Sequence, residues 1–579
     1  MSSLSRPAES APSADDQPAP VPPTSITPAR PAGLEWLIIA LALVALVVLR
    51  IHTIHSHQWN TDEPQHLHVV WGWTVGKLQY RDIFDNHTPL FHILSAPLLK
   101  AIGERADIIL VMRQAMIPLF ALSLWFIYRL AVATYDRRIA WFAVLLAGFL
   151  PPYFFRMGEY RTDVLWTTVW LAALAVGLSG ELKPRRTFAA ALLLGAAFGV
   201  SMKSTLLLLC LGVSGGITWW LAGRPISRQL GLHIAAFFAG LLLIPALIVG
   251  YFASQSALQP LYHCVIEHNT MPGQNLGATI RKNLLSQNLL WLIPVGLIAR
   301  AMLSSVRREP VQGWRRLFLF LIAGTFYTLL RGLWPVVTTQ DYMPWMPLLP
   351  IFAVAGLAWA QKWLLERKGI ALPWALAPAL LLLGEIAWVV KAEPFGKNED
   401  KRVSQYVSIF RLADPGEYVL DLKGETIFRP RPIYIALESL TRAQIQNGTL
   451  RDNTIERLIE TRTAVVNYSD RFMPKTKDFI ESNYVHVQNA RALGKKLPTV
   501  QGQPMKFEIA IPERYIFVGS KGPVQGTLDG QPIDGARWLD AGPHEVTITN
   551  HLGETSVFWS RAWDRGFSPY VTFDPGNPK

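Results

Sequence analysis

Apolar runs long enough to cross a lipid bilayer constrain the fold of this 579-residue chain more than any other feature. A transmembrane helix needs about 20 mostly apolar residues. Such runs lie at residues 34–50, 107–132, 139–153, 163–180, 187–202, 204–222, 230–252, 288–304, 317–335, 346–364 and 372–390. The sequence therefore predicts a polytopic α-helical membrane protein with about eleven transmembrane helices. The fifth run is short and ends next to Lys203, which leaves open both a full crossing and a broken, partly re-entrant helix.

Composition and charge agree with a membrane protein and argue against a nucleic-acid partner. Half of the residues are hydrophobic, and the mean hydropathy of +0.23 is too high for an ordinary soluble enzyme of this size. The formal net charge is +13, but the basic residues form small clusters in every second loop, at residues 137–138, 183–186, 224–228, 307–316 and 362–368. Because basic loops stay in the cytoplasm, this pattern places the N-terminus inside. With an odd number of spans, everything after Val390 lies outside, which predicts a multi-pass protein of a bacterial inner membrane with a periplasmic or extracellular C-terminal part.

The chain divides into four regions by composition and periodicity. Residues 1–33 are rich in Pro, Ala and Ser without periodicity, which predicts a disordered cytoplasmic tail. Residues 34–390 form the transmembrane region, and its first outer loop at 51–106 carries amphipathic helices. Residues 391–504 alternate amphipathic helical stretches with short apolar strands, which indicates an extracytoplasmic α/β domain. Residues 505–579 contain strands separated by Gly, Pro and Asp turns, which indicates a small β-sandwich domain.

Ionisable residues gather at the predicted outer ends of the spans. Asp62 and Glu63 lie in the first turn of a predicted amphipathic helix that follows the first span. Asp163 begins a later span, and Arg161 precedes it in the same short segment. Lys203 ends the fifth run, where a charge costs about 2.5–3.5 kcal/mol and usually faces a cavity or a partner. Because these positions share one face of the membrane, we expect the carboxylates to meet in one pocket, within reach of the Lys203 ammonium.

Short motifs follow one another in a fixed order along the transmembrane region. They are Asp62-Glu63, His87-Thr88-Pro89-Leu90, Arg161-Thr162-Asp163 and Tyr342-Met343-Pro344-Trp345. In this order they resemble the motifs of the GT-C superfamily, the polytopic glycosyltransferases that use polyprenyl- or dolichyl-phosphate sugars. Within it, residues 34–365 are most similar to the protein mannosyltransferase and aminoarabinose transferase family, which is like glycosyltransferase family 39. His87 stands where many relatives carry Lys, and a histidine with the usual pKa of about 6.5 is only partly charged at neutral pH.

The resemblance implies a glycosyltransferase that moves a sugar from a polyprenyl-phosphate donor to an acceptor at the outer face of the cytoplasmic membrane, with inversion. The leaving lipid phosphate is a stable anion, so the reaction needs a general base but no general acid. We expect Asp62 to be the base, Glu63 to orient acceptor or sugar, and Asp163 to pair with a cation or bind the sugar. Cations must hold the phosphate as negative charge collects on it. The predicted substrate-binding residues are His87, Arg161, Lys203, Arg331 and Tyr342. The acceptor stays open among a glycan, a lipid and a protein.

Alternatives remain open for the metal and for the function. Asp62 and His66, at i and i+4, could share a divalent metal ion, but the spacing fixes no third ligand, so no cofactor is assigned. A transporter or flippase of lipid-linked glycans would carry ionisable residues at mid-depth in several helices, together with internal repeats. A membrane-anchored protein that binds or assembles envelope glycans would work through its C-terminal part. Removing residues 391–579 would then abolish all function, whereas an enzyme core would keep donor binding.

Overall fold

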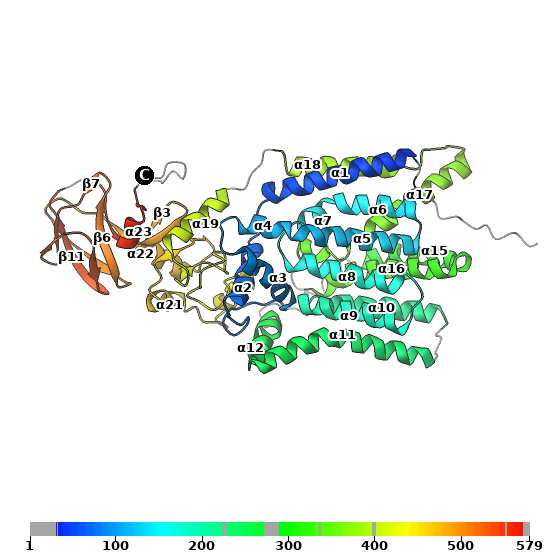
Figure 1. The fold of residues 1–579 in the computed structure, drawn as a ribbon, viewed down its shortest axis with the longest axis horizontal. Helices are drawn as coiled ribbons and strands as arrows, with labels where there is room; N and C mark the ends of the chain where they lie inside the picture. Colours follow the sequence, from blue (N-terminus) through cyan, green and yellow to red (C-terminus); the bar gives the residue numbers. More distant parts are fainter. Residues whose placement is uncertain are drawn as a thin grey trace, which may run out of the picture.

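The helical part and the strand-rich part of the molecule lie end to end along its longest axis (Figure 1). The computed structural model describes residues 31, 33–223, 228–270, 289–334, 337–395, 401–550 and 553–570. The predicted tail at 1–33 lies outside these residues except for positions 31 and 33, and so does the predicted basic loop at 224–228 except for position 228. The arrangement confirms the predicted fold class, a polytopic helical protein with a C-terminal region that contains sheets.

The helical part follows the predicted apolar runs. Its helices are α1 (Gly33–Ser56), α2 (Asp62–Thr74), α3 (Leu90–Ile102), α4 (Ile108–Gln114), α5 (Met116–Thr134), α6 (Arg137–Phe149), α7 (Pro151–Arg156), α8 (Thr162–Leu178), α9 (Pro184–Val200), α10 (Ser204–Leu221), α11 (Arg228–Ser254), α12 (Leu258–Tyr262), η2 (His263–Glu267), α13 (His268–Thr270), α15 (Leu289–Arg308), α16 (Pro310–Leu333), η4 (Thr339–Tyr342), η5 (Met346–Leu348), α17 (Leu349–Lys368) and α18 (Leu376–Ala392). Every predicted run coincides with at least one of these helices.

Not every run forms a helix long enough to span a membrane alone. Within the described residues, 6 helical segments are long and apolar enough by length and composition: Gly33–Ser56, Ile108–Thr134, Ser204–Leu221, Gln229–Ser254, Pro310–Leu333 and Met346–Lys368. The other runs give shorter or more polar helices; α8, α9 and α18 have 17 residues each and α6 has 13. Most residues of α6 and α8 are buried by neighbouring helices, so these two helices contact other helices more than they would contact lipid.

The fifth predicted run is a short helix that reaches the same end of the bundle as the start of α8. At 1.5 Å per residue, the 17 residues of α9 span about 26 Å, less than the hydrocarbon core of about 30 Å. Close packing against α11 holds α9 in place. A Cβ atom on Gly195 would lie 2.5 Å from the carbonyl oxygen of Leu241, and one on Gly240 would overlap that of Phe188. Glycine at both positions lets the two backbones touch.

Predicted basic loops meet at one end of the bundle. Arg138 forms an ion pair with Glu35 at the start of α1. Arg315 Nη2 donates to the carbonyl of Gly180 over 2.9 Å, and Arg316 Nε donates to that of Thr134 over 2.6 Å. Basic side chains thus bond to the ends of helices whose carbonyls lack partners within the helix. The alternating register inferred from the sequence therefore corresponds to a real spatial separation of the two ends of the bundle.

The C-terminal part contains two β-sheets with short helices beside them. The helices are α19 (Lys401–Leu412), α20 (Ser439–Gln446), α21 (Thr454–Glu460), α22 (Pro474–Asn483) and α23 (Ser560–Asp564). The strands are β1 (Val419–Leu420), β2 (Val465–Val466), β3 (Tyr484–Val487), β4 (Ala490–Leu497), β5 (Pro504–Ile509), β6 (Glu513–Gly519), β7 (Gly522–Pro523), β8 (Gly526–Leu528), β9 (Gln531–Pro532), β10 (Arg537–Leu539), β11 (Gly542–Ile548) and β12 (Thr555–Trp559).

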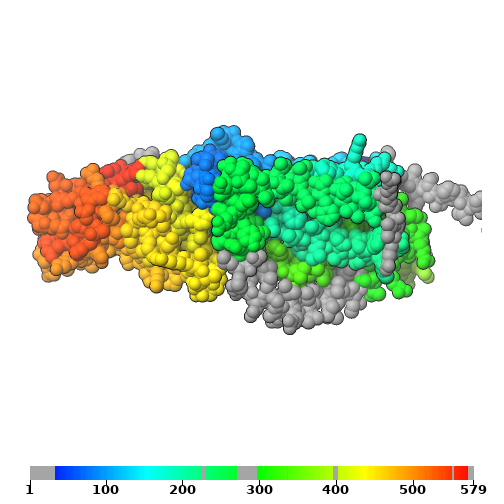
Figure 2. Space-filling model, turned by 90° about the horizontal axis from the view of Figure 1, so that it is seen from below, coloured from blue at the N-terminus to red at the C-terminus, as the bar shows by residue number. Residues whose placement is uncertain are grey.

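One sheet joins the two regions that the sequence predicts as separate domains. Its strand order is β1-β2-β4-β12-β6-β10, with β3 against β4 and β7 against β6, and β5-β11-β8-β9 form the second sheet. Strand β12 pairs antiparallel with β4, with Thr555 opposite Leu497, so the ladder crosses the predicted boundary at residue 504. The region then docks on the helical bundle: Tyr406, Ile427 and Phe428 are buried in the same apolar cluster as the helices. In Figure 2 the yellow C-terminal segment lies directly against the end of the bundle.

Candidate active site

Asp62 and Glu63 begin α2 just after the first helix, and their side chains have different surroundings. Successive residues of a helix point about 100° apart. The Glu63 side chain is completely buried, whereas 30% of the Asp62 side chain is exposed. The two neighbouring carboxylates therefore have separate roles, one inside the protein and one at the edge of a site.

The Glu63 carboxylate accepts hydrogen bonds on both oxygens from within the protein. Arg113 Nε lies 2.7 Å from Oε1 and Arg113 Nη2 lies 2.6 Å from Oε2. The backbone N–H groups of Tyr160 and Asn60 each donate to it over 2.9 Å. Burial raises the pKa of Glu63, but Arg113 and these amides lower it by more, so the carboxyl stays ionised. We expected Glu63 to orient acceptor or sugar; the structure gives its side chain no exposed surface, and its bonds to Arg113, Tyr160 and Asn60 hold the start of α2.

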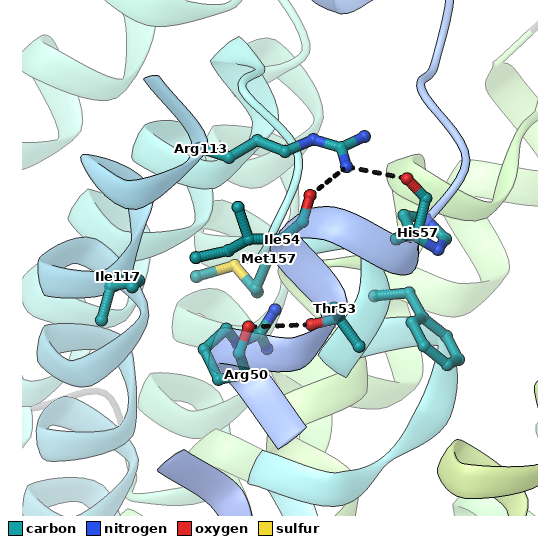
Figure 3. A pocket seen from close by; sticks show the side chains of 9 residues that line it. Arg50, Thr53, Ile54, His57, Arg113, Ile117 and Met157 are labelled. Carbon is teal, nitrogen blue, oxygen red and sulfur yellow. Dashed lines mark hydrogen bonds between the residues drawn. The ribbon is translucent and has the colours of Figure 1, made fainter. Parts of the chain in front are cut away.

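Arg113 also fixes the end of α1. Its Nη1 donates to the carbonyls of Ile54, over 3.2 Å, and His57, over 2.8 Å (Figure 3). A small cavity lies beside this contact, and Arg50 lines it from α1. The Arg50 guanidinium is buried between the rings of Phe120 and Phe154, and its Cζ lies 4.1 and 4.0 Å from the two ring centroids. These contacts hold the end of α1 beside the pair formed by Glu63 and Arg113.

Carboxylates and cations alternate in a chain that begins at Asp62. Arg161 binds Asp62 through Nη1 and Asp163 through Nη2, the latter at 3.0 Å. Lys203 Nζ lies 3.2 Å from the other oxygen of Asp163 and 2.5 Å from Asp341. The members come from the start of α2, the start of α8, the turn between α9 and α10, and η4. The structure thus brings together Asp62, Arg161, Asp163 and Lys203, all predicted from the sequence.

Exposure separates Asp62 from the other carboxylates of this chain. The side chains of Asp163 and Asp341 are only 4% and 2% exposed, against 30% for Asp62. Burial raises the pKa of Asp62, but the Arg161 and Lys423 charges hold it well below its usual range. Asp62 is therefore an ionised and partly exposed carboxylate, while Asp163 is enclosed between two cations. Asp163 pairs with both Arg161 and Lys203. Pairing with a cation is one of the two roles that the sequence predicts for Asp163, the other being contact with the sugar.

His87 lies at the edge of the same site beside a buried carboxylate. Its Nδ1 lies 2.8 Å from Asp85 Oδ1. Burial lowers the pKa of His87, but the Asp85 carboxylate raises it by more, so the net pKa lies above the usual 6.5. The fixed Asp85 partner thus favours the charged form of this histidine.

His66 lies among other histidines rather than in a metal site. Its ring centroid lies 4.7 Å from that of His87, and its Nδ1 lies 3.1 Å from His92 Nε2. Burial, together with the His87 and His92 charges, lowers the pKa of His66 well below the usual value. Within the described residues, no group of three or more His, Cys, Asp and Glu side chains could hold a metal ion. The pair formed by Asp62 and His66 therefore finds no third ligand there.

Arg331 and Tyr342 lie one step away from the chain of charges. Arg331 Nη1 donates to the Tyr327 hydroxyl over 2.6 Å. The Tyr327 ring packs on Tyr342 and on Trp345, with centroids 6.1 and 5.1 Å apart. Arg331 and the rings of Tyr327, Tyr342 and Trp345 thus form an aromatic wall. This wall adjoins the chain of ion pairs because Tyr342 directly follows Asp341, the partner of Lys203.

Lys423 is a member of the site that the sequence analysis missed. It follows β1 in the C-terminal region, and its Nζ forms an ion pair with Asp62 Oδ1, 361 positions away in sequence. A charged residue just after a strand of an α/β layer is a common position for a site, so the strand at 417–422 offered a signal. Arg113, also missed, offered a signal as well, because a charged residue inside the apolar run 107–132 needs a partner.

Comparison with known proteins identifies the fold. No protein-family model matches the chain, and no curated protein matches it significantly. ArnT from Cupriavidus metallidurans bound to undecaprenyl phosphate is similar, with a TM-score of 0.52 and 15% identity over 80% of this chain and 98% of that one. The apo state of the same protein has a TM-score of 0.50 and 15% identity, over 79% of this chain and 97% of that one. The apo form of the oligosaccharyltransferase from Archaeoglobus fulgidus has a TM-score of 0.47 and 12% identity, over 74% of this chain and 69% of that one. The likeness to ArnT shows that the two chains share a fold, as the resemblance of the sequence motifs predicts.

Proposed function

We propose that the protein is an integral membrane glycosyltransferase that moves a sugar from a polyprenyl-phosphate donor to an acceptor. The observation that carries this proposal is the single exposed carboxylate, Asp62, at the head of a chain of alternating charges. The GT-C fold supports it, since ArnT, with the same fold, binds undecaprenyl phosphate. The site lies at the end of the bundle opposite the basic loops, so we place it at the outer face of a bacterial cytoplasmic membrane, with the C-terminal region outside.

Asp62 is the general base of the proposed reaction. The acceptor hydroxyl gives its proton to an Asp62 oxygen while its own oxygen forms a bond to the anomeric carbon. The bond from that carbon to the phosphate oxygen breaks, and its electron pair leaves with the polyprenyl phosphate. One displacement inverts the anomeric centre, and the leaving phosphate needs no proton. Each carboxylate oxygen has two lone pairs, so Asp62 can accept from the acceptor while Arg161 still holds it.

Arg161, Lys203 and His87 are the proposed phosphate-binding groups. As the bond to the sugar breaks, negative charge collects on the phosphate, and fixed cations in a largely buried site stabilise it. Asp163 keeps Arg161 and Lys203 side by side, with bonds of 3.0 and 3.2 Å to one carboxylate. The aromatic wall that contains Tyr342 would cover the lipid-proximal side of the donor. The acceptor can be a glycan, a lipid or a protein.

The distribution of charge favours an enzyme over a transporter of lipid-linked glycans. A transporter would carry ionisable residues near the middle of several helices. Here Asp163 begins α8, Lys203 lies between α9 and α10, and Asp341 precedes α17, so all three lie at helix ends. The C-terminal region shares an apolar cluster with the helices, which also disfavours a function in which that region works alone.

The test uses the purified full chain in lipid nanodiscs. Native mass spectrometry measures binding of undecaprenyl phosphate, and a radiolabelled polyprenyl-phosphate sugar measures transfer to envelope extracts. Asp62→Asn should keep donor binding and lower turnover by about 10²- to 10⁴-fold, the usual contribution of a general base. Glu181→Gln, a carboxylate at the other end of the bundle with 83% of its side chain exposed, is the control. Absence of binding in the natural protein, or normal turnover in Asp62→Asn, would overturn the proposal.

A further inference from the structure

A loop of the C-terminal region reaches into the site and contacts the exposed carboxylate. This loop, residues 421–431, follows β1. Lys423 forms the ion pair with Asp62 and is itself only 7% exposed. Two further contacts dock the loop: His68 Nδ1 lies 2.8 Å from the carbonyl of Ile427, and Arg429 binds Glu104 through two bonds of 2.9 and 3.0 Å. The position of Lys423 is therefore set by an interface rather than by chance contact of a surface side chain.

The loop has a fixed internal shape. The buried Asp421 carboxylate accepts hydrogen bonds from the N–H groups of Gly424 and Thr426, both over 2.7 Å, and from Arg431 Nε over 2.8 Å. Gly424 adopts a φ of +97°, and a Cβ there would lie 2.7 Å from the Cβ of His68. Only glycine satisfies both the backbone conformation and this close approach. These contacts hold the backbone that carries Lys423, and its long side chain extends from this backbone to Asp62.

The charges of the site are balanced before any donor binds. Three carboxylates, Asp62, Asp163 and Asp341, face three cations, Arg161, Lys203 and Lys423. A fourth carboxylate, Glu159, lies 3.7 Å from Arg161 but pairs more closely with a cation of its own, Arg156, at 2.5 Å. A lipid phosphate adds at least one negative charge. Because each cation already pairs with a carboxylate, one of these ion pairs must break so that its cation can pair with the phosphate.

The three cations are not equally available. Arg161 and Lys203 are each held by two of these carboxylates. Among the described residues, Lys423 forms an ion pair with Asp62 alone. It is therefore the cation that leaves its partner at the lowest cost. A lysine ammonium on four methylene groups can swing between two anions while its backbone stays fixed.

We propose that Lys423 is a ligand of the donor phosphate, supplied by the C-terminal region, and that its ammonium moves from Asp62 to the phosphate when the donor binds. This inference rests on the proposed function of the site. The move places a positive charge on the phosphate and at the same time frees Asp62 Oδ1 to accept the proton of the acceptor. The site is then complete only when the 421–431 loop is docked on the helical bundle.

The test compares Lys423→Met with Lys423→Arg in the full chain. Affinity is measured in nanodiscs for undecaprenyl phosphate and for undecaprenol, which lacks the phosphate. Loss of one charge-assisted bond should weaken binding of undecaprenyl phosphate by about tenfold or more in Lys423→Met and leave undecaprenol unchanged. Lys423→Arg should keep most of the affinity. Lys496→Met removes an exposed lysine of the C-terminal region that pairs with Glu554, away from the loop and from Asp62, and it should change neither affinity by more than about twofold.

The outcomes separate this inference from the proposed function. If the natural protein binds undecaprenyl phosphate and Lys423→Met binds it equally well, the inference is wrong and the proposed function stands. If Lys423→Met loses affinity for both lipids to the same extent, Lys423 acts only in docking, and the inference is again wrong. If the natural protein does not distinguish the phosphate from undecaprenol, the proposed function itself fails.

Discussion

The buried pair of Glu63 and Arg113 allows a quantitative test of the reassigned role of Glu63. Glu63→Gln removes the negative charge from a completely buried position and leaves the Arg113 guanidinium, whose side chain is 1% exposed, without a counter-charge. Breaking a buried ion pair by removing one partner costs about 3–5 kcal/mol. The new side-chain amide would also turn an N–H₂ group toward the N–H donors of Asn60 or Arg113, where a carboxylate oxygen of Glu63 now accepts. We therefore expect a loss of about 3–5 kcal/mol in the free energy of unfolding.

A double-mutant cycle separates the pair from other effects. Arg113→Met should cost a similar amount, because it leaves the Glu63 carboxylate buried with only two backbone donors. The combined variant Glu63→Met with Arg113→Met should be no less stable than the worse single variant, because it leaves no unpaired charge. The assay is denaturant unfolding in mixed micelles at 25 °C, followed by tryptophan fluorescence. Below the unfolding transition, Glu63→Gln should still bind undecaprenyl phosphate with near-natural affinity.

Two results would refute this reasoning. If Glu63→Gln is as stable as the natural protein and yet loses turnover, Glu63 contacts substrate as the sequence first suggested. If the double variant is less stable than the natural protein by the sum of the two single losses, the two side chains do not act as a pair.

Further predictions concern pH and helix packing. Because Asp85 raises the pKa of His87 above 6.5, affinity for undecaprenyl phosphate should be full below about pH 6.5 and should fall as the pH rises through the raised value. His87→Lys should keep its affinity up to about pH 9, since lysine titrates near 10.4; an unchanged decline would exclude the charge of His87 from donor binding. Gly195→Leu should force α9 away from the Leu241 carbonyl and lower the thermal unfolding temperature, by a loss of at least about 1–3 kcal/mol. Gly250→Leu, with open space around it, is the matched control on α11, and equal losses in the two variants would contradict the packing argument.

The helices and much of the site could be predicted because their signals are local. A run of about 20 apolar residues identifies a membrane helix wherever its neighbours lie. A charge at the end of such a run is equally visible, because leaving it in lipid is costly. Arg161, Asp163 and Lys203 were found in this way, and Asp62 was found in the first turn of the predicted amphipathic helix. The structure brings all four into one chain of ion pairs.

The rest depends on contacts between distant parts of the chain. Asp62 and Glu63 look alike in the sequence, and their roles differ because Arg113 from another helix faces only one of them. Lys423 reaches Asp62 only after the C-terminal region docks through Ile427 and its neighbours. The pairing of β12 with β4 likewise joins segments about 60 residues apart, so alternation along each strand could not show that they share a sheet.

A structure of the full chain with bound undecaprenyl phosphate, determined by electron cryomicroscopy in nanodiscs, tests the account most directly. The phosphate should lie within about 4 Å of the ammonium groups of Lys203 and Lys423, and Asp62 should keep its contact with Arg161 while losing that with Lys423. A phosphate bound at the opposite end of the bundle, near Arg138 and Arg316, would contradict it.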